Sequence, residues 1–365
     1  MTYSRSRVTS TPADVEACVW RLVRTTNDGK SFQTVCESTN GNRAPVSEAD
    51  QGGNLYMAHP DWNDTRLPFL FYRFARGGGY GRPRIATLTN VSCAAKCAMA
   101  YDVRRKQFYI ATHYGHLFTV DPNGEERRRT AAFKTQGPHA ATQYPSLAVS
   151  PDGVLHFAMT TAGPNKRGKV IYWDIHYMKS TDGGLPWRKL DGTALPAEPA
   201  PDDTEPTDRI TGDDEFEVST WLAKMLVKDG KVHFLYRGKA TRHLRYDLGT
   251  GRRDVSLEGN QLGGKSITLW PASGLLAARL DKPGSPLYCV ARDPTRETVG
   301  CLVSHDNGRT WADHALAARK FGGCYALGGA RQVTDDGNII GSLTDSGPSG
   351  SSVWFYRIKV LDSCR

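Results

Sequence analysis

Two eight-residue segments of this chain, residues 180–187 and 304–311, share the pattern S-x-D-x-G-x-x-W. In such a segment the Ser and Asp side chains can bond to the backbone of a tight turn, and the Gly can adopt a positive φ. The Trp can then pack on the next strand. Residues 26–32 look like a third copy that is one residue short and has Phe in place of Trp. The pattern predicts turns between antiparallel strands.

A second repeat is a hairpin in which an apolar strand ends on a polar residue, seven positions after the residue that closes the turn. Six such hairpins recur roughly every 40 to 60 residues, a spacing typical of β-propeller blades. Equivalent positions in equivalent blades lie on one ring around the propeller axis. We therefore expect six residues to circle one mouth of the central channel: Arg73, His113, Thr160, Arg237, Asp281 and Thr344.

The S-x-D-x-G-x-x-W segments resemble the Asp box, or bacterial neuraminidase repeat, which marks propeller blades in enzymes and lectins alike. We predict an all-β fold, a single β-propeller over residues 1–365 with six or seven four-stranded blades and Asp-box turns. The N-terminal strand, residues 15–24, is expected to close the ring with the C-terminal blade, residues 325–362. A seventh blade around residues 14–52 is the alternative. The Pro-rich acidic segment 194–208 is expected to form an ordered loop or lid.

The chain carries a net charge of +9, with arginine runs at residues 104–106 and 127–129. A basic surface favours an anionic partner such as an acidic polysaccharide, although a solvated basic face is the alternative for each run. No nucleic-acid motif accompanies the charge, and no apolar stretch is long enough to span a membrane. We expect no nucleic-acid or membrane partner.

The eight cysteines form an even set, which fits disulfides and a secreted or periplasmic protein, with eight reduced thiols as the alternative. We predict at least two disulfides. Cys289 and Cys301 are the best candidate pair because they fall on consecutive predicted strands. Some of the four cysteines near the chain ends are expected to staple the ring closed: Cys18, Cys36, Cys324 and Cys364. Cys93 and Cys97 are four residues apart without a His-rich partner motif, so a zinc site is not favoured there.

Polar residues of the predicted ring suit an acidic ligand. Arginine forms paired hydrogen bonds with carboxylate and sulfate groups, so Arg73 and Arg237 point to such a ligand. Two imidazoles and a phenol gather in residues 112–116, and His titrates near neutral pH, so proton transfer is expected there. His139, before a predicted strand, and His59 are further candidates. His156 and His233 occupy matching strand positions, which indicates packing.

Residues 144–187 and 233–245 resemble repeat units of propeller polysaccharide lyases, which degrade ulvan or related glucuronate and rhamnose polymers. The resemblance implies β-elimination at a uronate by a monomer that acts on an acidic polysaccharide. It implies no cofactor; some lyases of this fold bind a structural metal ion, but no cluster here is specific enough to predict one. These lyases carry a second His about twenty residues before the first, where this chain has Cys93 and Ala94. The implied catalytic residues are His113, Tyr114, His116, His139 and Arg237, and the implied substrate-binding residues are Arg73, His59, Tyr144 and Arg242.

Two other functions remain open. A sialidase-like exo-glycosidase needs three arginines, a Tyr–Glu pair and an Asp acid; residues 82–84 are a poor echo of its Arg-Ile-Pro signature, and Glu215 and Glu217 could supply carboxylates. A non-catalytic glycan-binding propeller would repeat an aromatic site in each blade. The predicted ring positions differ from blade to blade, which favours one asymmetric catalytic centre.

Overall fold

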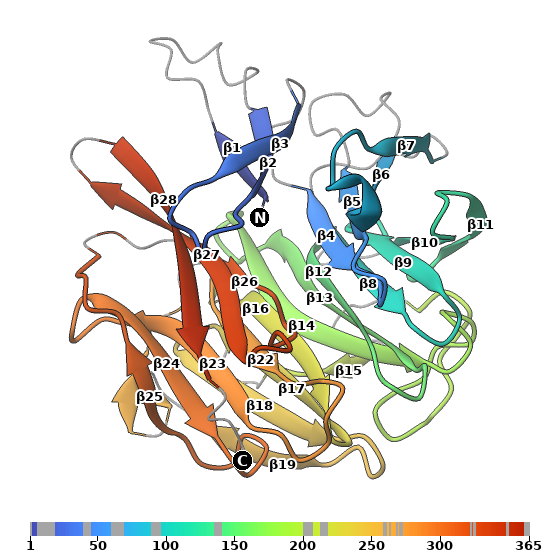
Figure 1. Cartoon of the computed structure of the whole chain (residues 1–365). Coiled ribbons are helices and arrows are strands. Elements are labelled where there is room, and N and C mark those ends of the chain that lie inside the picture. The colour runs from blue at the N-terminus through green and yellow to red at the C-terminus, as the bar shows by residue number, and fades with distance from the viewer. Residues whose placement is uncertain are drawn as a thin grey trace. The chain divides into compact units, whose positions relative to one another are not determined.

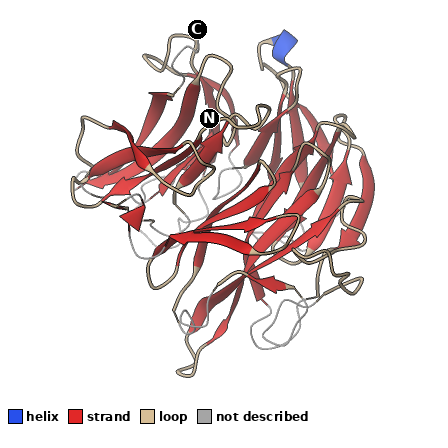
Figure 2. Ribbon diagram, turned by 90° about the horizontal axis from the view of Figure 1, so that it is seen from below, coloured by secondary structure: helices blue, strands red, loops and turns tan. Residues whose placement is uncertain are grey.

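The chain folds almost entirely into β-strands joined by turns, as seen in a computed structural model. The structure describes residues 2–5, 19–38, 45–59, 69–88, 96–134, 141–199, 207–211, 218–257, 261–262, 264–267, 269, 273–321, 323, 326–347 and 350–360. Over these residues the one helical element is a short 3₁₀ turn, η2 (Arg76–Gly78) (Figure 2). No helix among them is long and apolar enough to cross a membrane. The predicted fold class, an all-β propeller, is confirmed.

The strands form successive antiparallel meanders in which neighbours in sequence are neighbours in the sheet (Figure 1). The first two sheets are β1 (Thr2–Arg5), β2 (Val19–Arg24), β3 (Gln33–Ser38) and β4 (Val46–Ala49), β5 (Leu55–His59), β6 (Leu70–Phe74), β7 (Arg84–Thr87). The next two are β8 (Cys97–Asp102), β9 (Gln107–Thr112), β10 (His116–Val120), β11 (Glu126–Ala131) and β12 (Ala141–Val149), β13 (Leu155–Pro164), β14 (Val170–Ser180), β15 (Asp208–Arg209).

The remaining strands follow the same order, apart from one short two-stranded pair. They are β16 (Trp221–Lys228), β17 (Lys231–Arg237), β18 (Thr241–Asp247), β19 (Arg253–Leu257); β20 (Gln261–Leu262), β21 (Lys265–Ser266); β22 (Leu275–Ala278), β23 (Leu287–Asp293), β24 (Thr298–Ser304), β25 (Ala312–Leu316); and β26 (Ala326–Gly329), β27 (Asn338–Gly347), β28 (Gly350–Lys359).

The chain divides into two compact units. The first comprises Met1–Gly163, His176–Arg188 and Ala194–Thr207, and the second comprises Pro164–Ile175, Lys189–Thr193 and Asp208–Arg365. In the first unit β8 contacts both β4 and β12, and in the second unit β22 contacts both β16 and β26. The first strands of successive sheets therefore lie next to one another within each unit.

The six predicted hairpins fall in six different sheets, but not on equivalent strands. His113 follows β9, and Thr160, Arg237 and Thr344 lie on β13, β17 and β27, all second strands of their sheets. Arg73 instead lies on β6, a third strand, and Asp281 follows β22, a first strand. The predicted equivalence of all six positions is therefore wrong for Arg73 and Asp281.

The N-terminal strand β2 pairs with its neighbours in the sequence. Strand β2 pairs with β1 and β3, whereas the C-terminal sheet contains β26, β27 and β28. The predicted closure of the ring by this strand stays a prediction. The predicted loop at residues 194–208 is described only in part: Leu195 N donates to Trp187 O at 2.9 Å, and Pro199 O accepts from Lys134 N at 3.0 Å.

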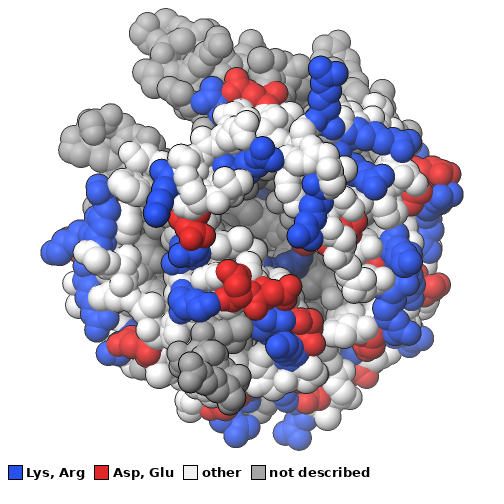
Figure 3. Space-filling view, in the orientation of Figure 1, with Lys and Arg blue, Asp and Glu red and all other residues white. Residues whose placement is uncertain are grey.

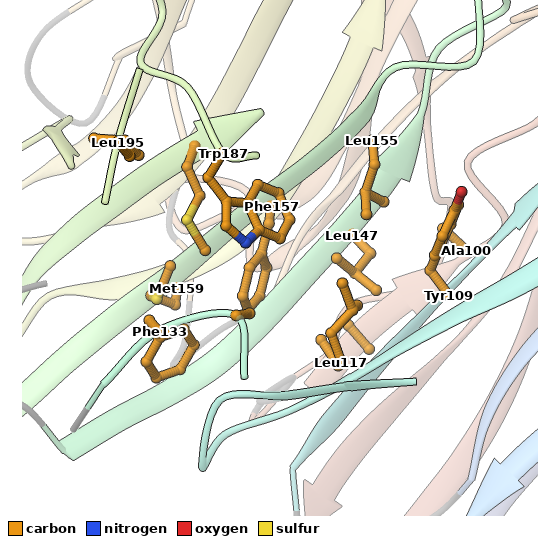
Figure 4. Packing of buried hydrophobic residues seen from close by; sticks show 14 residues of the cluster. Ala100, Tyr109, Leu117, Phe133, Leu147, Leu155, Phe157, Met159, Trp187 and Leu195 are labelled. Carbon is orange, nitrogen blue, oxygen red and sulfur yellow. The ribbon is translucent and has the colours of Figure 1, made fainter. Parts of the chain in front are cut away.

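The S-x-D-x-G-x-x-W turns are held by their own side chains. Ser180 Oγ accepts from Gly184 N at 2.9 Å, and Ser304 Oγ accepts from Gly308 N at 2.7 Å. Trp187 is fully buried in the core of the first unit and lies 6.0 Å from the Phe157 ring, between centroids (Figure 4). The shared motif therefore joins a hydrogen-bonded turn to a buried anchor.

The third copy has a different register from the one predicted. Thr25 Oγ1 accepts from Gly29 N at 2.9 Å, and Asn27 Oδ1 accepts from Ser31 N at 2.9 Å. The turn therefore begins at Thr25, with Asn27 in the Asp position, and the spacing to Phe32 is the full one. Phe32 is 43% exposed, so this copy lacks the buried anchor.

The predicted Cys289–Cys301 disulfide is wrong: both thiols are free. Strand register pairs Cys289 with Leu302 and Cys301 with Val290, so the two cysteines point to opposite faces of one sheet. They pack in separate apolar clusters. Burial raises the pKa of both thiols, that of Cys301 to about 12. Cys36 and Cys97 are also free, and the other four cysteines lie outside the described residues.

Candidate functional site

The turn between β9 and β10 carries two of the predicted catalytic residues, His113 and Tyr114. Gly115 N donates to Thr112 O at 3.1 Å, and Gly115 has a φ of 84°. A Cβ at Gly115 would lie 2.7 Å from Phe133 O, so only glycine fits this turn. His113 is 7% exposed, whereas Tyr114 is 44% exposed, and their rings lie 4.1 Å apart between centroids.

Lys96, which no motif in the sequence points to, lies opposite His113. Cys97 pairs with Thr112, and His113 N donates to Lys96 O at 3.1 Å, so the pairing continues to Lys96 and His113. Directly opposite residues of an antiparallel pair point to the same face, with Cβ atoms about 5 Å apart. The Lys96 and His113 side chains therefore leave the same face of this sheet.

Strand β12 brings a strained tyrosine to the same place. The β12–β13 register shifts between Gln143 and Ser146, and within this bulge Tyr144 has a φ of 50°. A non-glycine residue with positive φ is uncommon, and such strain clusters at functional sites. The Lys96 ammonium lies 4.0 Å from the centroid of the Tyr144 ring and donates a hydrogen bond to Gln143 Oε1.

These contacts define one group of side chains within the first unit, the His113 cluster: Lys96, His113, Tyr114, Gln143 and Tyr144. Thr142 holds the backbone of this cluster, because its hydroxyl donates a hydrogen bond to His113 O. Thr160 lies opposite Gln143, and within the described part of the chain its buried hydroxyl has no hydrogen-bond partner. The cluster offers a cation, an imidazole, two phenols and an amide.

His116 and His59 are less suited to the catalytic and substrate-binding roles predicted for them. His116 begins β10, and burial, with a contribution from nearby Arg129, lowers the pKa of its imidazole. A lowered pKa makes His116 a poor proton donor at neutral pH, which argues against the acid role predicted for it. His59 is 4% exposed, and its ring lies 5.9 Å from that of Trp20, so it packs in the core. His139 lies outside the described residues.

Arg73 lies away from the His113 cluster. Its guanidinium Nη1 is 3.4 Å from Asn123 Oδ1, and Asn123 lies in the turn after β10. His116 begins the same strand, whose five residues separate its ends by about 15 Å. Arg73 is therefore at the opposite end of β10 from the His113 turn, and it cannot bind the same small group.

Arg237 and Arg242 belong to the second unit. Arg237 Nη1 donates to Leu269 O at 3.1 Å, and Arg242 is largely buried opposite Tyr236. Their predicted roles in substrate binding and catalysis therefore stay predictions. Glu215 and Glu217, the carboxylates considered for a sialidase, lie outside the described residues.

The histidines expected to pack are buried. His156 Nδ1 lies 2.7 Å from the Tyr177 hydroxyl, and burial lowers the pKa of His156 to about 3. His233 Nδ1 lies 3.2 Å from His243 Nε2, and burial lowers the pKa of both rings, that of His243 to about 3. These imidazoles are neutral at physiological pH and pack in the core.

The arginine runs are largely engaged within the fold. Arg105 bonds Asp102 and the carbonyl of Thr181, at 2.9 and 2.8 Å, and Arg128 donates to the carbonyl of Gly183. The last two contacts hold the turn at residues 180–187. On the face shown in Figure 3, basic and acidic side chains are interspersed. Neither run forms a free basic strip.

No group of three or more His, Cys, Asp or Glu side chains within the described ranges is arranged to hold a metal ion.

No protein-family model matches this chain, and no curated protein matches it. Solved structures resemble it weakly. One is a PL25 ulvan lyase bound to -[GlcA(1-4)Rha3S]-, at 12% identity and TM-score 0.48 over 94% of this chain and 70% of that one. Others are a nidogen/laminin complex (12%, TM-score 0.40, 81% and 92%) and a protein of unknown function from Dyadobacter fermentans DSM 18053 (11%, TM-score 0.45, 87% and 79%). At TM-scores below 0.5, these similarities say nothing about what this chain binds or does.

Proposed function

We propose that this protein cleaves a uronate-containing acidic polysaccharide by β-elimination at the His113 cluster. The observation that carries the proposal is the placement of the Lys96 ammonium against Tyr144, on the same face as His113. A uronate needs a cation at its carboxylate, a base for the neighbouring carbon-bound proton and an acid for the leaving oxygen.

The chemistry divides among three side chains. Lys96 neutralises the carboxylate, which acidifies the proton on the adjacent carbon. His113, whose Nδ1 is buried, takes that proton with Nε2. The C–H electron pair forms the new carbon–carbon double bond, the glycosidic C–O bond breaks, and the Tyr144 hydroxyl protonates the leaving oxygen. Lys96 replaces Arg73 in the neutralising role, since Arg73 lies at the other end of β10.

The test is an ultraviolet assay across uronate polymers, because elimination creates an absorbing unsaturated uronate and hydrolysis does not. We expect turnover by the native protein and a loss of roughly 10²-fold or more in His113→Ala and in Lys96→Met. Lys134→Met, an exposed lysine on the loop after β11, is the matched control and should retain activity.

Three results would count against the proposal. Activity that survives both substitutions would place the site elsewhere. Binding of the polymers without turnover of any of them would favour a glycan-binding protein, and release of a sialic-acid reporter would favour a sialidase.

A further inference from the structure

Two arginines face each other across β6 and β7 in the first unit. Strand register pairs Arg73 directly with Arg84. Their side chains therefore leave the same face of the sheet, with Cβ atoms about 5 Å apart. Like charges placed directly opposite each other destabilise a sheet, so this pair opposes the fold unless something neutralises it.

No carboxylate of the described residues contacts either guanidinium. Arg84 is exposed. Arg73 is half-buried, and its Nε is buried without a hydrogen-bond partner among the described side chains. The hydrogen bond that the described residues give Arg73 is the 3.4 Å contact of Nη1 with Asn123 Oδ1. The pair keeps most of its donors available.

The neighbouring carboxylates are committed elsewhere. Asp121 bonds Arg127 at 2.9 Å, and Asp50 accepts from the Tyr56 hydroxyl at 2.9 Å. Glu48 lies opposite Tyr56 on β4, two strands from Arg73, which is about 9.5 Å away. Asp121 and Asp50 therefore have other partners, and among the described residues no ion pair joins Glu48 to either arginine.

One side of the pair is closed by packing. Two residues along the strands, Phe71 pairs with Ala86 on the same face, and both contact Gly124 in the turn after β10. A Cβ at Gly124 would be 2.4 Å from the Ala86 Cβ. The turn that carries Asn123 therefore covers this face, and the two guanidinium groups border a packed wall.

We infer that Arg73 and Arg84 form an anion-binding site for the sulfate or carboxylate group of an acidic ligand. Guanidinium groups match such oxyanions with paired hydrogen bonds, and a bound anion would remove the like-charge repulsion. The site lies beyond the far end of β10 from the His113 cluster and does not depend on the function proposed for that cluster. A sulfated or uronate-bearing polysaccharide and a free inorganic anion share this chemistry.

Thermal unfolding in sodium sulfate, compared with sodium chloride at equal ionic strength, tests the site. The melting temperature of the native protein should rise more in sulfate, because a ligand that binds the folded state stabilises it by mass action. In Arg84→Gln this excess should disappear. In chloride alone, Arg84→Gln should melt at the native temperature or roughly 1 °C above it, because the repulsion is gone.

Arg82→Gln is the matched control, since Arg82 is an exposed arginine two residues away and loses the same charge. Arg82→Gln should show the same extra rise of the melting temperature in sulfate as the native protein. It thereby shows how much of the change in a variant comes from losing one surface charge under the general effect of sulfate. Arg84→Lys, which keeps the charge but not the planar donor pair, should keep less of the extra rise. An equal sulfate excess in all variants, or a lower melting temperature of Arg84→Gln in chloride, would overturn the inference.

Calorimetric titration separates the two sources of the anion. Binding of a sulfated oligosaccharide at lower concentration than inorganic sulfate, lost in Arg84→Gln, would identify a polysaccharide ligand. Binding of inorganic sulfate alone, again lost in Arg84→Gln, would identify a free anion. Binding of both that is unchanged in Arg84→Gln would contradict the site, and an uncharged oligosaccharide serves as the blank.

Discussion

At the scale of single residues, the site depends on positions that carry no motif. Lys96 stands alone before an apolar strand in the sequence, and only the pairing of β8 with β9 places it beside His113. The bulge that turns Tyr144 toward Lys96 is likewise a product of strand register. His113 and Tyr114 could be predicted because two imidazoles and a phenol around a glycine are visible in the sequence.

Tyr144→Phe tests the residue whose backbone is strained. The variant keeps the ring against the Lys96 ammonium and the packing of β12, but it loses the hydroxyl that protonates the leaving oxygen. We expect turnover to fall roughly 10²-fold while the free energy of unfolding changes by less than about 1 kcal/mol. Kinetics on the active uronate polymer and urea unfolding measure the two effects. An unchanged rate would remove Tyr144 from the mechanism.

At the scale of elements, the turns and strands could be predicted more fully than their order in the sheets. The turn closures are local: Gly153 has a φ of 85° and Lys106 a φ of 53°, as expected of residues that close hairpins. The seven-residue offset cannot tell a second strand from a third, because each strand of a meander has the same apolar period. The offset therefore predicts the wrong end of the sheet for Arg73, and it does not show that Cys289 and Cys301 point to opposite faces.

A neighbouring sheet supports each S-x-D-x-G-x-x-W turn through an arginine. Arg128 on β11 bonds the carbonyl of Gly183, and Arg245 on β18 bonds that of Asp306 at 3.2 Å. Arg128→Ala should cost about 1–3 kcal/mol in the free energy of unfolding, because partly buried carbonyls lose their donor. Arg127→Ala, which removes exposed ion pairs only, should cost about 0–1 kcal/mol. Equal losses in urea unfolding would show that Arg128 is not a structural contact.

At the scale of the whole molecule, buried neutral histidines set how stability depends on pH. Burial lowers the pKa of His156, His233 and His243 in the folded protein, whereas in the unfolded chain each imidazole has a pKa of about 6.5. Below that value the unfolded state binds more protons, so the stability present above it is lost as pH falls toward 3. Each imidazole contributes up to about 1.4 kcal/mol per pH unit.

Urea unfolding between pH 7 and 4 measures this slope. His156→Gln keeps a side chain that can bond Tyr177 but removes one titrating group, so its slope should be smaller than that of the native protein by up to about 1.4 kcal/mol per pH unit. A native stability that does not fall between pH 6 and 4 would mean that the buried imidazoles are not neutral.

Elimination at the His113 cluster fixes the mass of the products, and mass spectrometry can measure it. Digestion of a uronate polymer in heavy-oxygen water should give fragments whose new non-reducing ends are unsaturated, which makes them one water lighter than the matching hydrolysis products, and the cleavage should add no heavy oxygen. The same fragments should be nearly absent with Lys96→Met. Heavy oxygen at the new chain ends, or unchanged fragments from Lys96→Met, would contradict the account.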